Sequence, residues 1–278
     1  MDIAGKTLAI TGAASGIGRA LAVEGMRRGA NIAAADLDAS RLSKTRALAQ
    51  DAAPSADQFC SVHSLDVANL AQWGSFRTQV LDEHGEIDGI INNAGITFSG
   101  SVAGMSYQQL ERVMSINFMG MVYGCKEFLP ELTTRPQAVI ANVSSVFGLF
   151  PKKDHAAYCA SKYAIRGFTE VFAQELREST VLVSTVHPGH IATNIVQRAM
   201  DDGHVLEPNM SEEDIEAWLK GFKAYGLAPD KAATIILDGI GAGQRRIFVG
   251  EDALEGDRLS RADPDGFADA VNDTASVE

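Results

Sequence analysis

The sequence has 278 residues, 46% of them hydrophobic and 22% charged, which suits a globular protein with a sizeable core. Its formal net charge of −12 argues against nucleic acid or an anionic membrane surface as a partner, and no stretch approaches the roughly 20 apolar residues of a membrane span. The N-terminus has no signal-peptide pattern and the three scattered cysteines match no metal or redox spacing, so we expect a cytoplasmic protein without a resident metal.

A glycine-rich turn follows the first predicted strand. Residues 6–11 are a short apolar run, glycines stand at positions 12, 16 and 18, and residues 19–29 have a helical pattern. Glycines let the backbone approach a pyrophosphate, and a helix N-terminus offers free N–H groups to the anion. A purely structural turn is the alternative, but it does not need three glycines at this spacing. The pattern therefore predicts a dinucleotide site.

The second predicted strand, residues 31–35, ends at Asp36. An acidic residue about 20 positions after the glycines is typical of a contact with the ribose hydroxyls of NAD. Asp36 as a solvated turn residue is the alternative. Leu37 offers no charge to a phosphate of NADP, and Arg41 lies a turn further along a helix. We expect NAD to be preferred, with Arg19 as the nearby group that would soften the preference.

Helical and apolar segments then alternate to the end of the predicted sheet. The expected helices are residues 39–50, 70–83, 106–132, 157–179 and 229–240, and the expected strands are residues 58–65, 87–91, 138–143, 181–186 and 246–249. The strands are apolar throughout, as expected when helices cover both faces of a parallel sheet. We predict an α/β fold, a Rossmann-type doubly wound parallel sheet. Polar or glycine-containing residues follow several strands, where such sheets bind ligands.

Tyr158 and Lys162 lie four residues apart in the predicted helix 157–179, so their side chains share one face. An ammonium beside a phenol favours the phenolate and lowers the phenol's pKa, which makes a general acid or base. The pair alone is a weak signal, because any surface helix can carry it by chance.

Together these motifs resemble those of the short-chain dehydrogenase/reductase family, in its standard-length single-domain branch, over about residues 3–250. TGAASGIG at residues 11–18 is similar to its cofactor turn, and NNAG at residues 92–95 to its central-strand motif. Tyr158 and Lys162 match its YxxxK pair. Ser145 matches its catalytic serine, and Asn117 matches its helix asparagine.

The resemblance implies a mechanism and a set of cofactor contacts. Tyr158 exchanges a proton with the substrate oxygen, and Ser145 binds that oxygen. Lys162 lowers the pKa of Tyr158 and holds the nicotinamide ribose, while Asn117 supports a water path. The implied cofactor contacts are Gly12, Ser15, Gly16, Ile17, Gly18, Asp36, Leu37, Asp66, Val67, Asn93, Ala94, Gly95, Tyr158, Lys162, Pro188, Gly189, Ile191 and Thr193.

Two segments interrupt the alternation. Residues 190–228 contain no predicted strand and are longer than an ordinary connection, so they form either a substrate lid or a structural elaboration; we favour the lid. Residues 255–278 are acidic and poor in large apolar side chains, which predicts a tail that is either mobile or packed on a neighbour. The catalytic domain is therefore expected to span residues 1–254.

Apolar side chains near the predicted crevice favour a fairly hydrophobic substrate. Phe147, Ile195 and Trp218 are candidate contacts, as is His190 after the Pro-Gly turn. The wider apolar set also contains Phe98, Val146, Leu149, Phe150, Met200, Met210 and Phe222, which alternatively form the core of the lid. Ser144, His155, His187 and Cys159 are more simply structural.

The predicted function is NAD-dependent interconversion of a secondary alcohol and a ketone. One alternative is a non-catalytic dinucleotide sensor or scaffold, which the complete set of predicted catalytic residues argues against. Another is an epimerase or dehydratase of longer-chain relatives, which the glycine spacing disfavours. Helices 106–132 and 157–179 carry apolar residues on more than one face, so we expect a homodimer or homotetramer.

Overall fold

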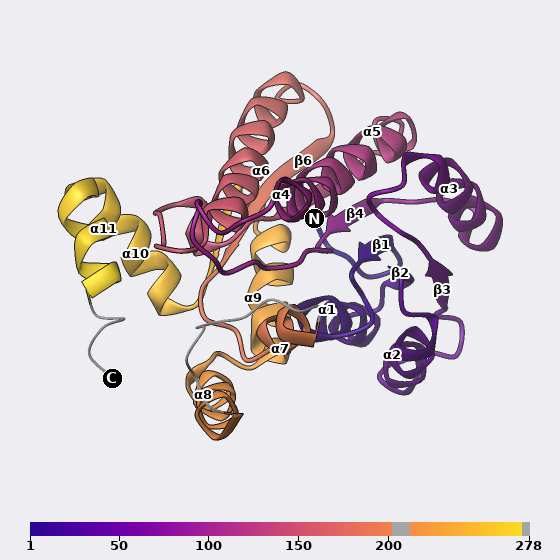
Figure 1. Ribbon diagram of the computed structural model, residues 1–278. Helices are drawn as coiled ribbons and strands as arrows, with labels where there is room; N and C mark the ends of the chain where they lie inside the picture. Colours follow the sequence, from indigo (N-terminus) through magenta and orange to yellow (C-terminus); the bar gives the residue numbers. More distant parts are fainter. Residues whose placement is uncertain (202–211, 274–278) are drawn as a thin grey trace.

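The computed structural model describes residues 1–201 and 212–273 (Figure 1). Seven parallel strands form one sheet in the order β3-β2-β1-β4-β5-β6-β7. The strands are β1 (Thr7–Thr11), β2 (Asn31–Asp36), β3 (Cys60–Ser64), β4 (Gly89–Asn92), β5 (Ala138–Val143), β6 (Val181–Pro188) and β7 (Arg246–Val249). The chain order reverses direction between β1 and β4, so the predicted doubly wound sheet is confirmed.

Helices cover both faces of the sheet (Figure 1). One face packs on α1 (Gly16–Arg27), α2 (Ala39–Asp51) and α9 (Pro229–Gly241), and the other on α3 (Leu70–His84), α5 (Gly120–Leu132) and α6 (Ala156–Glu175). Alternate residues of one strand serve the two cores: Leu8 and Ile10 belong to the first, and Ala9 to the second. This two-sided burial is why the strands are apolar throughout.

The helix predicted over residues 106–132 is interrupted in the structure. Its expected capping box forms between Ser106 and Gln109 at the start of α4 (Tyr107–Met114). A π-helical turn, Ser115–Met119, then precedes α5. Such a turn holds one extra residue and is frequent at functional sites. Here it contains Asn117.

In its described residues, the segment after β6 forms the helices α7 (Ile195–Asp201) and α8 (Glu212–Tyr225). In the described part of residues 190–228 no strand forms, but a single β-bridge joins Ile191 to Leu227. The Ala192 N–H also donates to the Leu227 carbonyl at 2.9 Å. The two ends of the segment are therefore fastened together.

The end of the chain forms helices where the sequence predicted a tail. Two helices follow β7: α10 (Glu251–Ala262) and α11 (Pro264–Asp273). Acidic composition concealed them, because the few apolar contacts that hold them lie at single positions such as Phe267, which packs on Phe150. No helix in the described residues is both long and apolar enough to cross a membrane.

Candidate active site

The glycine-rich turn between β1 and α1 depends on its glycines. Gly12 and Gly16 have positive φ values of 66° and 54°, which side chains disfavour. A Cβ on Gly12 would lie 2.8 Å from the Ala94 Cα, and a Cβ on Gly18 would lie 2.2 Å from the Gly12 carbonyl oxygen. Ser15 is the N-cap of α1, and Ile17 packs on the core. The turn leaves the N-terminus of α1 at the carboxyl edge of the sheet, a position suited to a phosphate.

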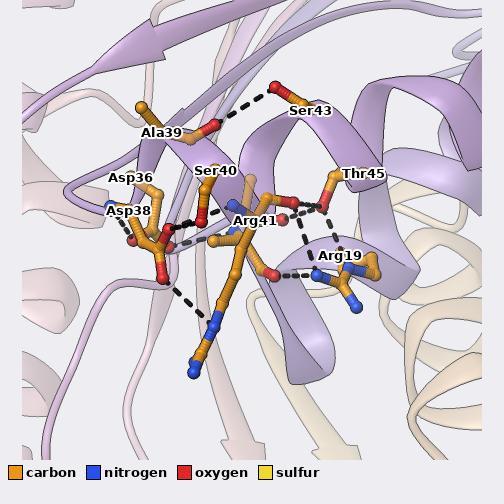
Figure 2. A network of polar contacts seen from close by, with 10 residues as sticks. Arg19, Asp36, Asp38, Ala39, Ser40, Arg41, Ser43 and Thr45 are labelled. Atoms are coloured by element: carbon orange, nitrogen blue, oxygen red, sulfur yellow. Dashed lines mark hydrogen bonds and ion pairs between the residues drawn. The ribbon is translucent and has the colours of Figure 1, made fainter.

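Asp36 joins the end of β2 to this turn (Figure 2). Its carboxylate accepts hydrogen bonds from the N–H groups of Ala14 at 3.0 Å and Asp38 at 3.1 Å. Leu37 is 70% exposed. The position agrees with a contact to an adenosine ribose, and it also gives Asp36 a second task that the sequence did not indicate: it fixes the backbone of the turn.

Arg19 belongs to α1, and its side chain extends towards α2 (Figure 2). Its Nε donates to the Thr45 hydroxyl at 3.0 Å, and its guanidinium also donates to the carbonyls of Ala14 and Arg41. Arg41 itself forms an ion pair with Asp38 at 3.1 Å. Protein groups thus already engage both arginines near Asp36.

The loops after β3 and β4 are fixed by local hydrogen bonds. The Thr11 hydroxyl accepts from the N–H groups of Asn93 at 3.0 Å and Ala94 at 3.1 Å. The Asp66 carboxylate accepts from the Ala68 N–H at 3.0 Å, and the Val67 carbonyl accepts from the Trp73 indole at 2.9 Å. These predicted cofactor residues therefore hold defined positions at the same edge of the sheet.

Ser145, Tyr158 and Lys162 come together where β5 meets α6. The Ser144 hydroxyl donates to the Lys162 carbonyl at 2.8 Å, and the Lys162 Nζ donates to the Val143 carbonyl at 3.0 Å. Lys162 Nζ lies 5.4 Å from the centre of the Tyr158 ring. The Tyr158 side chain is hydrogen-bonded to that of Ser145.

Burial controls the protonation of this cluster. It raises the pKa of Tyr158 to about 12, against a smaller lowering by the Ser145 hydrogen bond. Burial also lowers the pKa of Lys162 to about 7. In the chain alone the net pKa of Tyr158 is therefore raised and not lowered, because desolvation disfavours both the phenolate and the ammonium.

Asn117 connects the π-helical turn to this cluster. Its Oδ1 accepts from the Ile96 N–H at 2.8 Å, and its Nδ2 donates to the Ser161 hydroxyl at 3.0 Å. A Cβ on Gly95 would lie 3.2 Å from the Asn117 Oδ1 and 3.5 Å from the Lys162 Nζ. Gly95 thus leaves the space beside the Asn117 Oδ1 and the Lys162 Nζ free of a side chain.

The end of β6 completes this edge. The Gly189 N–H donates to the Val249 carbonyl at 2.9 Å, and Ile191 is buried. The Thr193 methyl lies beside Gly16, where an added Cβ would be 3.2 Å away. Pro188 ends the strand. Of the predicted contacts after β6, Thr193 therefore adjoins the glycine-rich turn.

His187 is structural, as expected. It is fully buried, its Nδ1 donates to the Ser145 carbonyl at 3.1 Å, and its ring stacks on Phe248. Burial lowers its pKa to about 4, so the imidazole is neutral near pH 7. A neutral histidine in this place fixes the backbone of Ser145 without adding charge to the site.

The predicted substrate residues separate into groups. Phe147 contacts Tyr158 edge to face, with ring centres 6.3 Å apart, and the rings of His190 and Phe222 lie 4.1 Å apart. Ile195 is the first residue of α7. Trp218 lies in α8, but its side chain and the whole of Met210 are outside the described residues. Phe98 is buried with Val113 and Ala157, which places it in the core and not in a pocket.

Two residues near the site were missed. Asp252, in the first turn of α10, accepts from the His190 N–H at 2.6 Å, and Phe267 reaches the loop after β5. The sequence signal for Asp252 was an acidic pair directly after Gly250, which is typical of a helix start. Within residues 1–201 and 212–273, no group of three or more potential metal-ligating side chains occurs.

Known proteins match this chain along most of its length. The family model described as short chain dehydrogenase matches residues 6–203. A Mycobacterium tuberculosis protein named as an oxidoreductase, SadH, is 37% identical, with 92% of this chain and 90% of that protein covered. Levodione reductase of Leifsonia aquatica is 29% identical, with 83% and 85% covered.

A solved structure has the same fold. It is a short chain dehydrogenase/reductase from Burkholderia phymatum in complex with NAD, with a TM-score of 0.83 and 27% sequence identity. The match covers 95% of this chain and 96% of that chain.

Proposed function

Because the chain belongs to the short-chain dehydrogenase family, we propose that it is an NAD-dependent oxidoreductase that interconverts a secondary alcohol and a ketone. The observation that carries the proposal is the hydrogen-bonded pair of Tyr158 and Ser145 beside the buried Lys162. This cluster lies at the carboxyl edge of the sheet, where ligands bind in this architecture.

Each residue of the cluster has a part in the proposed reaction. Tyr158 is the general acid or base that exchanges a proton with the substrate oxygen. Ser145 donates a hydrogen bond to the same oxygen and stabilises the negative charge that develops there. Asn117 fixes the π-helical turn beside the site through its bonds to Ile96 and Ser161. We also propose that a path of water molecules lies next to Asn117.

The pKa directions favour the reductive half of this chemistry in the chain alone. With its pKa raised to about 12, Tyr158 is protonated at neutral pH and ready to protonate a ketone oxygen. Lys162, with a pKa of about 7, is balanced between its two forms. A proton on Lys162 favours the phenolate, so charging this lysine would assist the oxidative direction.

The residues present fit a bound dinucleotide. Gly12 and Gly16 keep the turn free of side chains, Gly95 does the same in front of Lys162, and Asp36 lies at the end of β2. When bound, NAD supplies the hydride acceptor and NADH the hydride donor. We propose that Asp36 favours NAD, because a carboxylate accepts hydrogen bonds from ribose hydroxyls and repels a phosphate. The neighbour solved with NAD supports this choice.

We propose a fairly hydrophobic small-molecule substrate. Phe147 packs against Tyr158, and His190 with Phe222 forms a second aromatic pair after β6. Residues 190–228 are proposed to cover the substrate, supported by the position of Thr193 beside Gly16.

We also propose a cytoplasmic location. The three cysteines are buried and form no disulfide, which suits a reducing cytoplasm.

Turnover with a small ketone panel tests the proposal. The purified chain would be mixed with NADH and 2-butanone, cyclohexanone or acetophenone, and the loss of NADH absorbance recorded. We expect reduction of at least one alicyclic or aromatic ketone and slower reaction with NADPH. NADH binding without turnover of any ketone or of the matching alcohols would instead favour a dinucleotide sensor.

A further inference from the structure

Four aromatic rings connect the C-terminal helix α11 to Tyr158. Phe267 meets Phe150 at 4.9 Å between ring centres and 86° between ring planes. Phe150 meets Phe147 at 6.0 Å and 80°, and Phe147 meets Tyr158 at 6.3 Å and 86°. Each contact is edge to face, the arrangement that aromatic pairs favour. The series therefore runs without a break from α11 to the proposed acid.

Polar contacts hold α11 against the same loop. The Lys152 Nζ donates to the Val271 carbonyl at 3.1 Å, in the last turn of α11 where helix carbonyls attract a cation. The Lys153 N–H donates to the Asn272 Oδ1 at 2.8 Å. Both lysines belong to the loop between Ser145 and Tyr158, so α11 is bonded to the segment that joins these two residues.

Helix α10 makes the neighbouring contacts. Gly256 lets it approach Phe150, since a Cβ there would lie 2.6 Å from the Phe150 Cε1. At its start, the Asp252 carboxylate accepts from the His190 N–H at 2.6 Å and fills the space beside Gly189. The helix pair thus contacts the loops that follow both β5 and β6.

We infer that α10 and α11 brace the substrate side of the active site and that Phe267 is a positioning residue that acts on Tyr158 through Phe150 and Phe147. The kinetic part of this inference rests on the proposed ketone reduction. A helix pair that merely covered apolar surface would account for the burial of Phe150. It would not need hydrogen bonds to both Lys152 and Lys153.

Loss of the brace should have a specific kinetic signature. Phe147 packs edge to face on Tyr158 and also contacts His155, with ring centres 5.6 Å apart. If the loop loosens, Phe147 no longer holds a fixed place beside the ketone, so substrate binding and proton transfer both suffer. The glycine-rich turn lies at the ends of other strands and makes none of these contacts. Binding of NADH should therefore change much less than the kinetics with the ketone.

The test compares Phe267→Ala with Phe267→Leu, which keeps apolar volume, and with the control Phe59→Ala. Phe59 is also a half-buried phenylalanine, but it contacts Arg46 and His84 beside β3, at the opposite edge of the sheet from β7. Hydrogen exchange reports on the Gly148, Leu149 and Phe150 amides, which donate to Ser145 and Val146. The KM and kcat are measured with the panel ketone that the parent reduces best, and NADH affinity by fluorescence.

We expect these three amides to exchange about tenfold faster in Phe267→Ala, less in Phe267→Leu and no faster in Phe59→Ala. The ketone KM should rise and kcat/KM fall on the order of tenfold in Phe267→Ala alone. The inference is overturned if these amides exchange no faster in Phe267→Ala than in the parent chain. It is also overturned if they exchange faster but the ketone kinetics of Phe267→Ala match those of Phe59→Ala. A parent chain without ketone turnover contradicts the proposed function instead, and the exchange result then decides the bracing by itself.

Discussion

Asp36 carries the proposed cofactor preference at the scale of one residue. Its carboxylate accepts from Ala14 and Asp38 and still has acceptor capacity for ribose hydroxyls. We expect kcat/KM for NAD to exceed that for NADP by about 10²-fold, on the order of 3 kcal/mol. Asp36→Ala should narrow the gap, mainly by raising the KM for NAD. Equal use of both cofactors by the parent chain would contradict this assignment.

Arg19 sharpens the same prediction. Because its guanidinium is bonded to Ala14, Thr45 and Arg41, it is less available to a phosphate than its position in the sequence indicated. Arg19→Met is therefore expected to destabilise the glycine-rich turn and to weaken the binding of NAD and NADP to the same extent. Parallel measurements of the KM for NAD and for NADP test this. A loss confined to NADP would make Arg19 a phosphate ligand.

Local spacing made the proposed catalytic residues recognisable. Tyr158 and Lys162 share a helix face, and Ser145 precedes the tyrosine at the spacing of the family motif. Both spacings can be read without knowing the rest of the fold. Their pKa values were not predictable, because the dominant cause is burial by residues distant in sequence. Asp252 and Phe267 were missed for the same reason: they reach the site only after the sheet brings the ends of β5 and β6 together.

At the scale of elements, periodicity located most helices and strands but not the irregular turn. Strands Ala138–Val143 and Arg246–Val249 have the predicted bounds. The π-helical turn at Ser115–Met119 keeps the apolar pattern of the helices around it. Only the bonds of Asn117 to Ile96 and Ser161 reveal why the extra residue is there.

A buried polar network ties β3 to α3. The Ser61 hydroxyl lies 2.6 Å from the His63 Nε2 and 2.7 Å from the His84 Nε2, and the His63 Nδ1 lies 3.2 Å from the Gln79 Oε1. Burial lowers the pKa of His63, and it lowers that of His84 to about 4. Both imidazoles are thus neutral in the folded chain at pH 7.

This network predicts the direction of acid sensitivity. Between about pH 6.5 and pH 4 the unfolded chain binds more protons than the folded one, so the free energy of unfolding falls as the pH falls. His84→Gln, which cannot be charged, should reduce that loss by about 1 kcal/mol after allowance for partial exposure. Urea unfolding of the parent chain and of His84→Gln at pH 7.5 and 4.5 measures the loss in the free energy of unfolding. An identical loss in parent and variant would contradict the role of His84.

For the whole molecule, exposed apolar residues on α4 and α6 predict self-association. Tyr107 is 82% exposed, and on α6 Val171 is 60% and Tyr163 41% exposed. We expect a dimer or tetramer by light scattering at micromolar concentration. Val171→Asp should shift it towards smaller species, whereas Leu48→Asp, on α2 and 43% exposed, should not. A monomeric parent chain would exclude this assembly.

The layered architecture followed from the sequence because alternating βα units leave few topologies. The C-terminal helices did not, because Phe267 is one apolar residue in an acidic segment and its partner Phe150 lies far away in the chain. Whole-molecule packing thus places on the site two elements that composition had assigned to a tail.

The rate of NADH-dependent ketone reduction by Tyr158→Phe tests the proposed role of Tyr158 most directly. The variant keeps the ring that packs on Phe147 and removes only the hydroxyl bonded to Ser145. We expect a fall in kcat of about 10²–10⁴-fold with nearly unchanged NADH affinity. Tyr163→Phe, five residues on in the same helix, should keep the parent rate. Near-parent turnover by Tyr158→Phe would contradict the assignment of Tyr158 as the proton donor.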